Sequence, residues 1–237
     1  MTNHSGLMGG LFAISEWIMK FSLTNLFWIL FNLPIAFLLL NLLFVEKLEE
    51  VLFFLIPLAL LMPMLFFPAT TAMFAVVRGW IMKTEDSEKL FRPFLRFYKE
   101  NYKRSVGNGL FVTLIWLIWA VDLYYFLDKN KIMVIVFIVL GMLLFVFTIN
   151  LFSVTVHYHM KWLPSLKNTF FITIGSPLLF IAVALCSGII LYISFNVFTF
   201  LLPFLTGSLI AFLSFSAFYR NFLTHTKKEE APTSTEL

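Results

Sequence analysis

The residues with the clearest chemical potential are one carboxylate and two nearby indoles. Asp122 lies in a long apolar stretch, and Trp116 and Trp119 precede it by about two turns and one turn of a helix. A carboxylate at the centre of a membrane helix costs about 2.5–3.5 kcal/mol on insertion and is usually functional. Stacking on indoles and hydrogen bonds to the carboxylate could bind a sugar. Tyr124 and Tyr125 follow directly, however, which favours Asp122 at the outer membrane interface, with the indoles facing lipid or other helices.

A second candidate site is a proline-rich stretch that ends in small and hydroxylated residues. Pro57, Pro63 and Pro68 interrupt a run of 27 uncharged residues, and Thr70 and Thr71 follow the last proline. Prolines free backbone carbonyls that other groups must satisfy, and small residues let a second helix approach closely. One interpretation is a broken helix that lines a transport pathway. The alternative, which we favour, is a kinked helix at a tight packing seam.

A third candidate is a row of cations at helical spacing. The row consists of Lys89, Arg92, Arg96, Lys99 and Lys103, at successive separations of 3, 4, 3 and 4 positions. This spacing places all five on one stripe of a helix. The opposite side carries Leu90, Phe91, Phe94, Leu95, Phe97, Tyr98 and Tyr102.

The pattern predicts that the polar segment 81–105 contains an amphipathic helix in the inner membrane interface. Its aromatic side would lie in the acyl boundary and its basic side near anionic lipid phosphates. Pro93 predicts that this helix begins or kinks nearby. The alternative is that the helix docks onto a cytoplasmic protein partner.

No motif in the sequence predicts an enzyme, a metal site or a cofactor. His157 and His159 form an isolated His-x-His pair, which is a weak metal signal. Cys186 is the single cysteine and lies in an apolar run, so an intramolecular disulfide is excluded. Metalloprotease, nucleophile-elbow and phosphate-loop patterns are missing from the sequence. We therefore expect no catalytic residues, and nothing predicts nucleic acid as a partner.

The elements that must position these residues are transmembrane helices. The chain is 60% hydrophobic and 13% charged, whereas soluble domains carry about 25% charged residues. Its apolar runs reach the roughly 20 residues that a bilayer of about 30 Å requires. The composition therefore predicts an all-α polytopic bundle, in a single domain over residues 1–223.

Six spans are predicted from the uncharged runs. They cover residues of about 21–45, 51–77, 106–127, 132–156, 169–193 and 198–219. The last two are separated because 168–219 holds 52 residues without a formal charge, about 78 Å as one helix, so the chain must turn back. Residues 194–196 are the predicted turn. Residues 224–237 are polar and are predicted to be a disordered cytoplasmic tail.

The cations predict the orientation. With the N-terminus inside, 14 of the 17 Lys and Arg residues lie on the inner side. The outer side keeps Lys47, Lys129 and Lys131. Positive residues concentrate in cytoplasmic connections, so both termini are predicted to be cytoplasmic.

Several sequence blocks carry a family resemblance. FPATTAMFAVVRGW at 67–80, with Arg78 near its end, precedes FRPFLRFYKENYKRS at 91–105. Together with Trp17 and NLFW at 25–28, these blocks resemble the YesL-like family of bacterial integral membrane proteins, a family of unknown function. The resemblance covers roughly 9–223, and the second half matches mainly in hydropathy.

The resemblance implies a multi-pass protein of the bacterial plasma membrane. Members of that family often occur beside carbohydrate ABC transporters, so it implies an accessory component of carbohydrate uptake with transporter subunits as partners. It supplies no catalytic residues. The alternative hypothesis is that the bundle is itself a permease or channel for a small solute, using Asp122 and the proline-broken helix.

Overall fold

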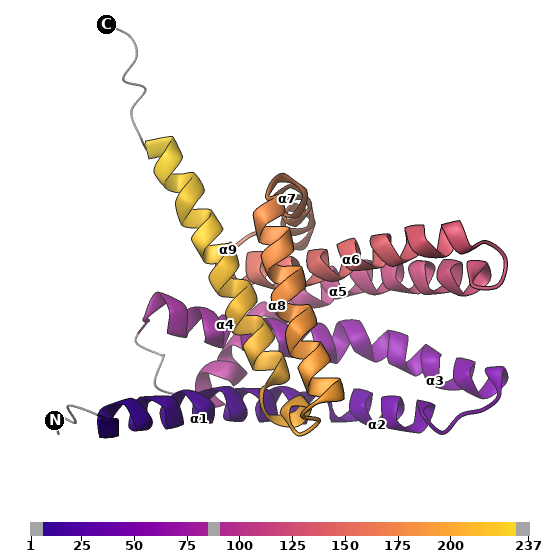
Figure 1. Cartoon of the computed structure of the whole chain (residues 1–237), viewed down its shortest axis with the longest axis horizontal. Coiled ribbons are helices and arrows are strands. Elements are labelled where there is room, and N and C mark those ends of the chain that lie inside the picture. Colours follow the sequence, from indigo (N-terminus) through magenta and orange to yellow (C-terminus); the bar gives the residue numbers. More distant parts are fainter. Residues whose placement is uncertain (1–6, 85–90, 231–237) are drawn as a thin grey trace, which may run out of the picture.

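The structure is a computed structural model and describes residues 7–84 and 91–230. It is all-helical, as predicted from composition (Figure 1). Within the described ranges, five helices are long and apolar enough to cross a bilayer, or six if one bent pair counts as a single span. The helices are α1 (Leu7–Phe31), α2 (Leu33–Leu42), α3 (Leu48–Leu61), α4 (Phe67–Met82), α5 (Phe91–Phe126), α6 (Lys131–His157), α7 (Trp162–Gly175), α8 (Pro177–Asn196) and α9 (Gly207–Glu230), with π-helical segments η1 (Met62–Phe66) and η3 (Leu202–Thr206).

The predicted first span, 21–45, is not a straight helix. α1 starts at Leu7, and the axis bends by 74° between α1 and α2. The bend falls at Asn32, whose side-chain Nδ2 donates to the Trp28 carbonyl at 2.7 Å. Pro34 follows within the first turn of α2 and lacks an N–H, so it cannot continue the hydrogen-bond ladder of α1.

The second apolar run forms one continuous helical path of α3, η1 and α4. The path covers 33 residues from Glu50 to Met82. Pro63 lies in η1, where the helix widens to π geometry, and Pro68 lies in the first turn of α4. A π segment is a local insertion that commonly marks a functional position. The prolines therefore widen this path locally and do not divide it into two spans.

The predicted interfacial helix is not a separate element. α5 runs for 36 residues without interruption, a length of about 54 Å. Pro93 lies in its first turn, where a missing N–H is tolerated. The basic row and the third span thus belong to one helix. Residues 85–90 of the predicted segment, with Lys89, lie outside the described residues.

The predicted fifth span, 169–193, is divided at Ser176. α7 ends at Gly175 and α8 begins with Pro177. Ser176 has φ −125° and ψ 79°, outside the helical region, as expected for a residue before proline. The spanning helix therefore starts eight residues later than predicted.

The end of the chain also differs from prediction. α8 continues through the predicted turn to Asn196, and the reversal lies between α8 and η3. α9 extends to Glu230, so the predicted disordered tail starts too early. Its residues 231–237 lie outside the described part of the chain.

α4 is the centre of the bundle. Its residues from Phe67 to Val77 are all buried, and it packs against α5, α6 and α9. Ala69, Ala72 and Ala75 lie on it, and small residues let neighbouring helices approach closely in membranes. Figure 1 shows α8 and α9 crossing the other long helices steeply.

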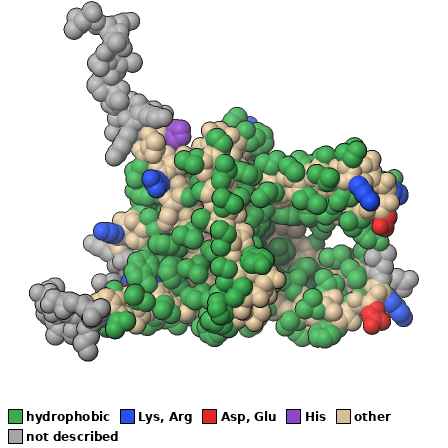
Figure 2. Space-filling model, viewed as in Figure 1, with side chains coloured by type: hydrophobic (Ala, Val, Ile, Leu, Met, Phe, Trp, Pro, Cys, Tyr) green, Lys and Arg blue, Asp and Glu red, His purple; other side chains and the backbone are tan. Residues whose placement is uncertain are grey.

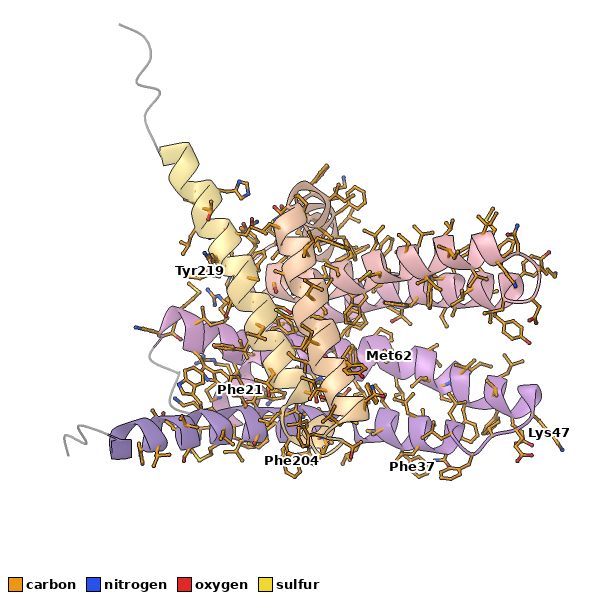
Figure 3. The ribbon with its side chains drawn as sticks, viewed as in Figure 1. Phe21, Phe37, Lys47, Met62, Phe204 and Tyr219 are labelled. Atoms are coloured by element: carbon orange, nitrogen blue, oxygen red, sulfur yellow. The ribbon has the colours of Figure 1, made fainter. Side chains whose placement is uncertain are left out.

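The outer surface of the bundle is apolar, and the charges lie at its ends. Figure 2 shows hydrophobic side chains along the helices, with Lys, Arg, Asp and Glu near the extremities. We call the end at which α4 and α6 finish and α5 begins the basic end. The opposite end, with the α2–α3 and α5–α6 connections, is the hairpin end. In Figure 3, Lys47 marks the tip of the α2–α3 hairpin, and Phe37 points away from the bundle.

Candidate functional site

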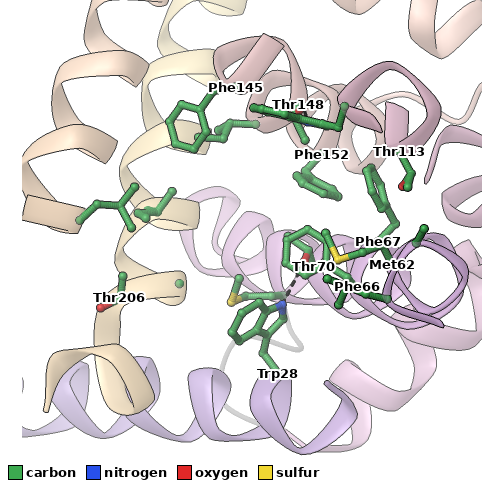
Figure 4. Close-up of a pocket in the computed structure, with 18 of the residues that line it drawn as sticks. Trp28, Met62, Phe66, Phe67, Thr70, Thr113, Phe145, Thr148, Phe152 and Thr206 are labelled. Carbon is green, nitrogen blue, oxygen red and sulfur yellow. Dashed lines mark hydrogen bonds between the residues drawn. The ribbon is translucent and has the colours of Figure 1, made fainter. Parts of the chain in front are cut away.

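A cavity of about 620 Å³ opens between two helical arms of the molecule. One arm is α3, η1 and α4, and the other is the α5–α6 hairpin; α8, η3 and α9 close one side. Figure 2 shows a hollow between these arms. The walls carry aromatic rings from five elements, among them Trp28, Phe66, Phe74, Trp116, Phe145 and Phe152 (Figure 4).

Four threonines supply hydroxyl groups to the cavity wall. Trp28 Nε1 donates to Thr70 Oγ1 at 2.9 Å (Figure 4), and Trp116 Nε1 donates to Thr148 Oγ1 at 3.2 Å. Thr206 Oγ1 lies 2.7 Å from Ser194 Oγ. The two indoles thus tie α1 to α4 and α5 to α6.

Thr113 differs from the other threonines of the wall. Its side chain is 9% exposed, and its hydroxyl has no hydrogen-bond partner among the described residues. A buried hydroxyl without a partner costs about 1–3 kcal/mol. Thr113 thus places a buried hydroxyl without a partner in the cavity wall.

Both π segments border this cavity. η1 contributes Met62 and Phe66, and η3 contributes Leu202 and Thr206. Each has a proline at its second position, Pro63 in η1 and Pro203 in η3. Since π segments are rare and frequently lie at functional sites, their coincidence marks this cavity as the candidate site.

Asn25 of α1 holds η3 in place. Its Nδ2 donates to the carbonyls of Leu202 at 3.1 Å and Pro203 at 2.7 Å, and its Oδ1 accepts from Ser208 N at 3.1 Å. Gly207 permits this contact, because a Cβ there would lie 2.8 Å from Asn25 Oδ1. The fully buried amide thus satisfies backbone groups that the proline and π geometry free.

The structure brings together only part of the predicted site. Trp116, Trp119 and Thr70 line the cavity, and Trp119 Nε1 donates to the Phe137 carbonyl at 2.7 Å. Asp122 does not line it and is half-exposed further along α5. A combined indole and carboxylate site in this cavity is therefore not formed.

Pro68 and Thr71 of the proline-rich stretch are buried where α4 packs against its neighbours. Pro68 is buried in the first turn of α4. Thr71 Oγ1 donates to the Phe67 carbonyl at 2.8 Å and accepts from Ser105 Oγ of α5 at 2.9 Å. A Cβ atom added to Gly109 of α5 would lie only 2.9 Å from Pro63 Cα. The backbone of α5 therefore passes very close to η1. This seam agrees with the packing interpretation of the block.

Part of the aromatic side of the basic row packs against α1, while Phe91 of the same side is exposed. Phe94 is fully buried, with ring centroids 6.1 Å from Phe27 and 5.5 Å from Phe31 of α1. The Tyr98 ring lies tilted against Phe31, with ring centroids 4.7 Å apart. For Phe94 and Tyr98 the predicted insertion into the acyl boundary is therefore wrong, because these side chains pack against α1.

The cations of this row point outward at the basic end. Arg92, Arg96, Lys99 and Lys103 are exposed. We call these four residues the basic face. Since part of the opposite side of α5 is packed against α1, the basic face is held in a defined position.

Two further arginines are built into the basic end. Arg104 Nη1 donates to the carbonyls of Tyr158 at 3.0 Å and Met160 at 3.3 Å, and Nη2 donates to Asn101 Oδ1. These bonds fix the backbone of the α6–α7 connection. Burial raises the pKa of the Tyr158 phenol in this connection. Arg78 is half-buried, and its Nε has no hydrogen-bond partner among the described residues.

Sequence reasoning missed Asn25, Thr113 and the second proline turn at Pro203. Each is a polar or helix-breaking residue inside an uncharged run. Such residues were a usable signal, because polar groups at membrane depth need partners. Only Thr113 of the three lines the cavity, and Asn25 meets the turn at Pro203 through a contact between α1 and η3, which are far apart in sequence.

These features define the class as a multi-pass helical membrane protein with an apolar cavity. A family profile described as "Protein of unknown function, DUF624" matches residues 21–123. The uncharacterized protein YesL of Bacillus subtilis is 28% identical over 94% of this chain and 95% of its own length. The chain is thus similar to members of the YesL-like family over nearly its whole length.

A second relative covers a shorter part of both proteins. The uncharacterized protein YteU of Bacillus subtilis is 30% identical over 61% of this chain and 57% of its own length. No solved structure gives a significant match. The resemblance noted in the sequence, to which residues 67–80 with Arg78 contribute, is thus confirmed at the level of the family.

Proposed function

We propose that this chain is an accessory membrane component of carbohydrate uptake, working beside an ABC-type transporter in a bacterial plasma membrane. The link to carbohydrate uptake comes from the YesL-like resemblance described above. The observation that carries an accessory role is the basic face. Four exposed cations stand at the start of a helix whose other side is fixed by α1. A rigid cationic surface suits an acidic protein partner or anionic lipid.

The same cations support an orientation. Lys83, Lys161 and the basic face lie at the basic end, while Lys47 and Lys129 lie at the hairpin end with Glu46 and Asp128. By the positive-inside rule, the basic end faces the cytoplasm. Both termini are then cytoplasmic in this proposal, and the basic face meets the inner leaflet and cytoplasmic proteins.

The cavity favours an accessory role over a sugar permease. Sugars need several hydrogen-bonding groups in their binding site, because burying unpaired hydroxyls is unfavourable. The lining is dominated by aromatic and aliphatic side chains, with indole N–H groups already used on Thr70, Thr148 and the Phe137 carbonyl. Asp122 lies away from it. This chemistry suits an apolar occupant.

Co-purification tests the accessory role. The tagged protein is solubilised from native membranes of cells grown on inducing sugars, and co-purifying proteins are identified by mass spectrometry. We expect transporter subunits to be recovered, and to be largely lost in the double variant Lys99→Glu with Lys103→Glu. The matched control is Lys129→Glu with Lys131→Glu, which reverses two cations at the hairpin end. Equal recovery of transporter subunits with both variants would show that the basic face does not bind them.

A deletion strain tests the link to carbohydrate. Growth and uptake are measured on a panel of oligosaccharides and on glucose, with the wild-type gene restored as a control. The proposal expects slower growth on one or a few oligosaccharides and equal growth on glucose. Unchanged growth on every oligosaccharide, together with no transporter subunit in the purified sample, would refute the carbohydrate role.

A permease is the second candidate, and the two proline-containing π segments favour it. Broken helices next to a central cavity are common in transporters, and η1 and η3 both border this one. The expected substrate is a small amphipathic solute, given the lining. Purified protein in liposomes should then transport such a solute without a partner, and Ala59→Phe should block transport. Absence of flux for a broad panel of solutes would exclude this candidate.

A further inference from the structure

We propose that the cavity between the two arms binds one acyl chain of a membrane phospholipid, which enters from the surrounding bilayer. This inference concerns a lipid-binding site and does not depend on whether the protein serves carbohydrate uptake. It rests on the size of the cavity, the chemistry of its lining, the bulk of its wall residues and the side on which it opens.

The first argument is size and chemistry. A volume of about 620 Å³ falls within the roughly 300–1,000 Å³ of specific ligand pockets. An ordered water needs about two to four polar partners, and three of the four wall threonines already hold hydrogen bonds within the protein. The lining therefore favours an apolar ligand over a chain of waters or a hydrated solute.

The second argument distinguishes a flexible chain from a partner helix. Helices pack in membranes through small residues that let two backbones approach. This wall carries bulky rings such as Phe66, Trp116 and Phe145, and a helix with side chains is about 10–12 Å across. An acyl chain is far thinner and can pass between the rings. The cavity walls therefore favour an acyl chain over a helix of a partner protein.

The third argument is access from the membrane. α3 contacts α2 and η1 but has no extensive contact with α5 or α6. The two arms therefore separate toward the hairpin end, as Figure 1 shows for α3 and the α5–α6 hairpin. Residues on both arms, such as Ile56 and Ile118, are exposed and apolar. The opening thus lies at the depth of the hydrocarbon, where phospholipid chains are available.

Some wall residues are shielded from annular lipid. Phe74 is 2% exposed, Phe152 4% and Thr113 9%, yet all three line the cavity. A lipid that merely surrounds the protein cannot contact them. An acyl chain inside the cavity reaches the small part of these side chains that remains uncovered there, so labels on them report occupation.

Photo-crosslinking tests the inference with the full chain. The protein is reconstituted in vesicles that contain phosphatidylglycerol with a diazirine near the end of one acyl chain. After illumination, labelled residues are mapped by mass spectrometry. We expect labels on Phe74, Thr113 or Phe152, in addition to exposed positions such as Ile138. Labels confined to exposed positions would overturn the proposal.

A filling variant and a matched control separate binding from background. Ala59→Phe places a ring in the cavity wall, whereas Gly188→Phe adds one where a Cβ meets no atom within 4 Å. We expect Ala59→Phe to lower labelling of the shielded residues about tenfold, equal to about 1.4 kcal/mol of binding free energy, and Gly188→Phe to leave it unchanged. Equal labelling in both variants contradicts the site.

Competition with unlabelled lipids identifies which lipid supplies the acyl chain. Excess unlabelled phosphatidylglycerol should reduce labelling of Phe74, Thr113 and Phe152. Displacement by a polyprenyl phosphate, with no effect of phosphatidylglycerol, would overturn the assignment to phospholipid. Protein that fails to fold is recognised by its elution in size-exclusion chromatography, and a second filling variant, Ala120→Phe, then replaces Ala59→Phe.

Discussion

The basic half and the hairpin half of the bundle use the same apolar residue types but pack them differently. In the basic half, hydroxyl and amide side chains join neighbouring helices: Ser105 of α5 to Thr71 of α4, and Asn108 of α5 to Thr155 of α6. In the hairpin half, α3 makes no extensive contact with α5 or α6, and a cavity separates the two arms.

The comparison shows that hydrophobicity alone does not close a membrane bundle. Lipid chains are as apolar as leucine, so helices associate through close packing and interhelical hydrogen bonds. The basic half has both, with Ala69 and Ala72 at the centre of α4. The hairpin half has bulky rings that face each other across a space. Substitutions should therefore be costly in the first region and mild in the second.

The largest expected effect is at Asn25, which joins α1 to η3 through three hydrogen bonds. Replacement by Leu should destabilise the protein by about 2–4 kcal/mol, because each membrane hydrogen bond contributes about 0.6–1.7 kcal/mol and buried partners lose theirs. Thermal unfolding in nanodiscs measures this. Asn41→Leu is the control, since Asn41 is partly exposed and its Nδ2 bonds only the Phe37 carbonyl of its own helix. A similar loss for both would contradict the role of Asn25.

The next effect is at Gly109, where α5 passes closest to η1. A Cβ there would lie 2.8 Å from the Phe67 ring and 2.9 Å from Pro63 Cα. Gly109→Ala should cost about 1–3 kcal/mol through overpacking. In contrast, Gly188→Ala has open space and should stabilise the helix slightly, because Ala has the higher helix propensity. If both variants melt alike, the seam is looser than described.

A smaller effect is expected at the edge between the two regions. Trp28→Phe removes the hydrogen bond to Thr70 and keeps most of the ring, so we expect a loss of about 1 kcal/mol. A double-mutant cycle with Thr70→Val measures the coupling between the two side chains. Strict additivity would mean that this bond does not contribute to stability.

The smallest effect on stability is expected at Thr113 in the cavity wall. Thr113→Val removes a hydroxyl that has no partner among the described residues. We therefore expect unchanged or slightly higher thermal stability, within about 1 kcal/mol. Thr155→Val is the matched change in the basic half, where Thr155 accepts from Asn108 at 3.0 Å, and it should lower stability. A loss at Thr113 as large as at Thr155 would remove the contrast between the two regions.

Particular elements show where sequence reasoning succeeded and where it did not. Helix class follows from the apolar runs, and Pro93 lies in the first turn of its helix, as proline geometry requires. The bend at Asn32 and the break at Ser176 were missed, because an apolar run has the same hydropathy whether or not its axis changes direction. The basic row was recognised as one helical stripe, but its aromatic side was assigned to lipid.

That last error has a physical reason. Phe94 and Tyr98 are equally suited to lipid and to another apolar helix, so a pattern within one helix cannot distinguish them. The structure decides in favour of α1, through Phe27 and Phe31. The same limit applies to Trp116, for which the sequence left lipid and another helix as alternatives; its indole N–H bonds Thr148 of α6.

The sequence by itself indicated membrane-spanning helices, an all-helical class and the resemblance to the YesL-like family, because run length, composition and short motifs are local properties of the chain. Only the tertiary structure decided that Asn25 supports a proline turn near the other end of the chain, that α1 covers part of the aromatic side of α5, and that two π segments border one cavity. These depend on distances between residues far apart in sequence. In an apolar solvent, hydropathy assigns no preferred neighbour to an apolar helix face.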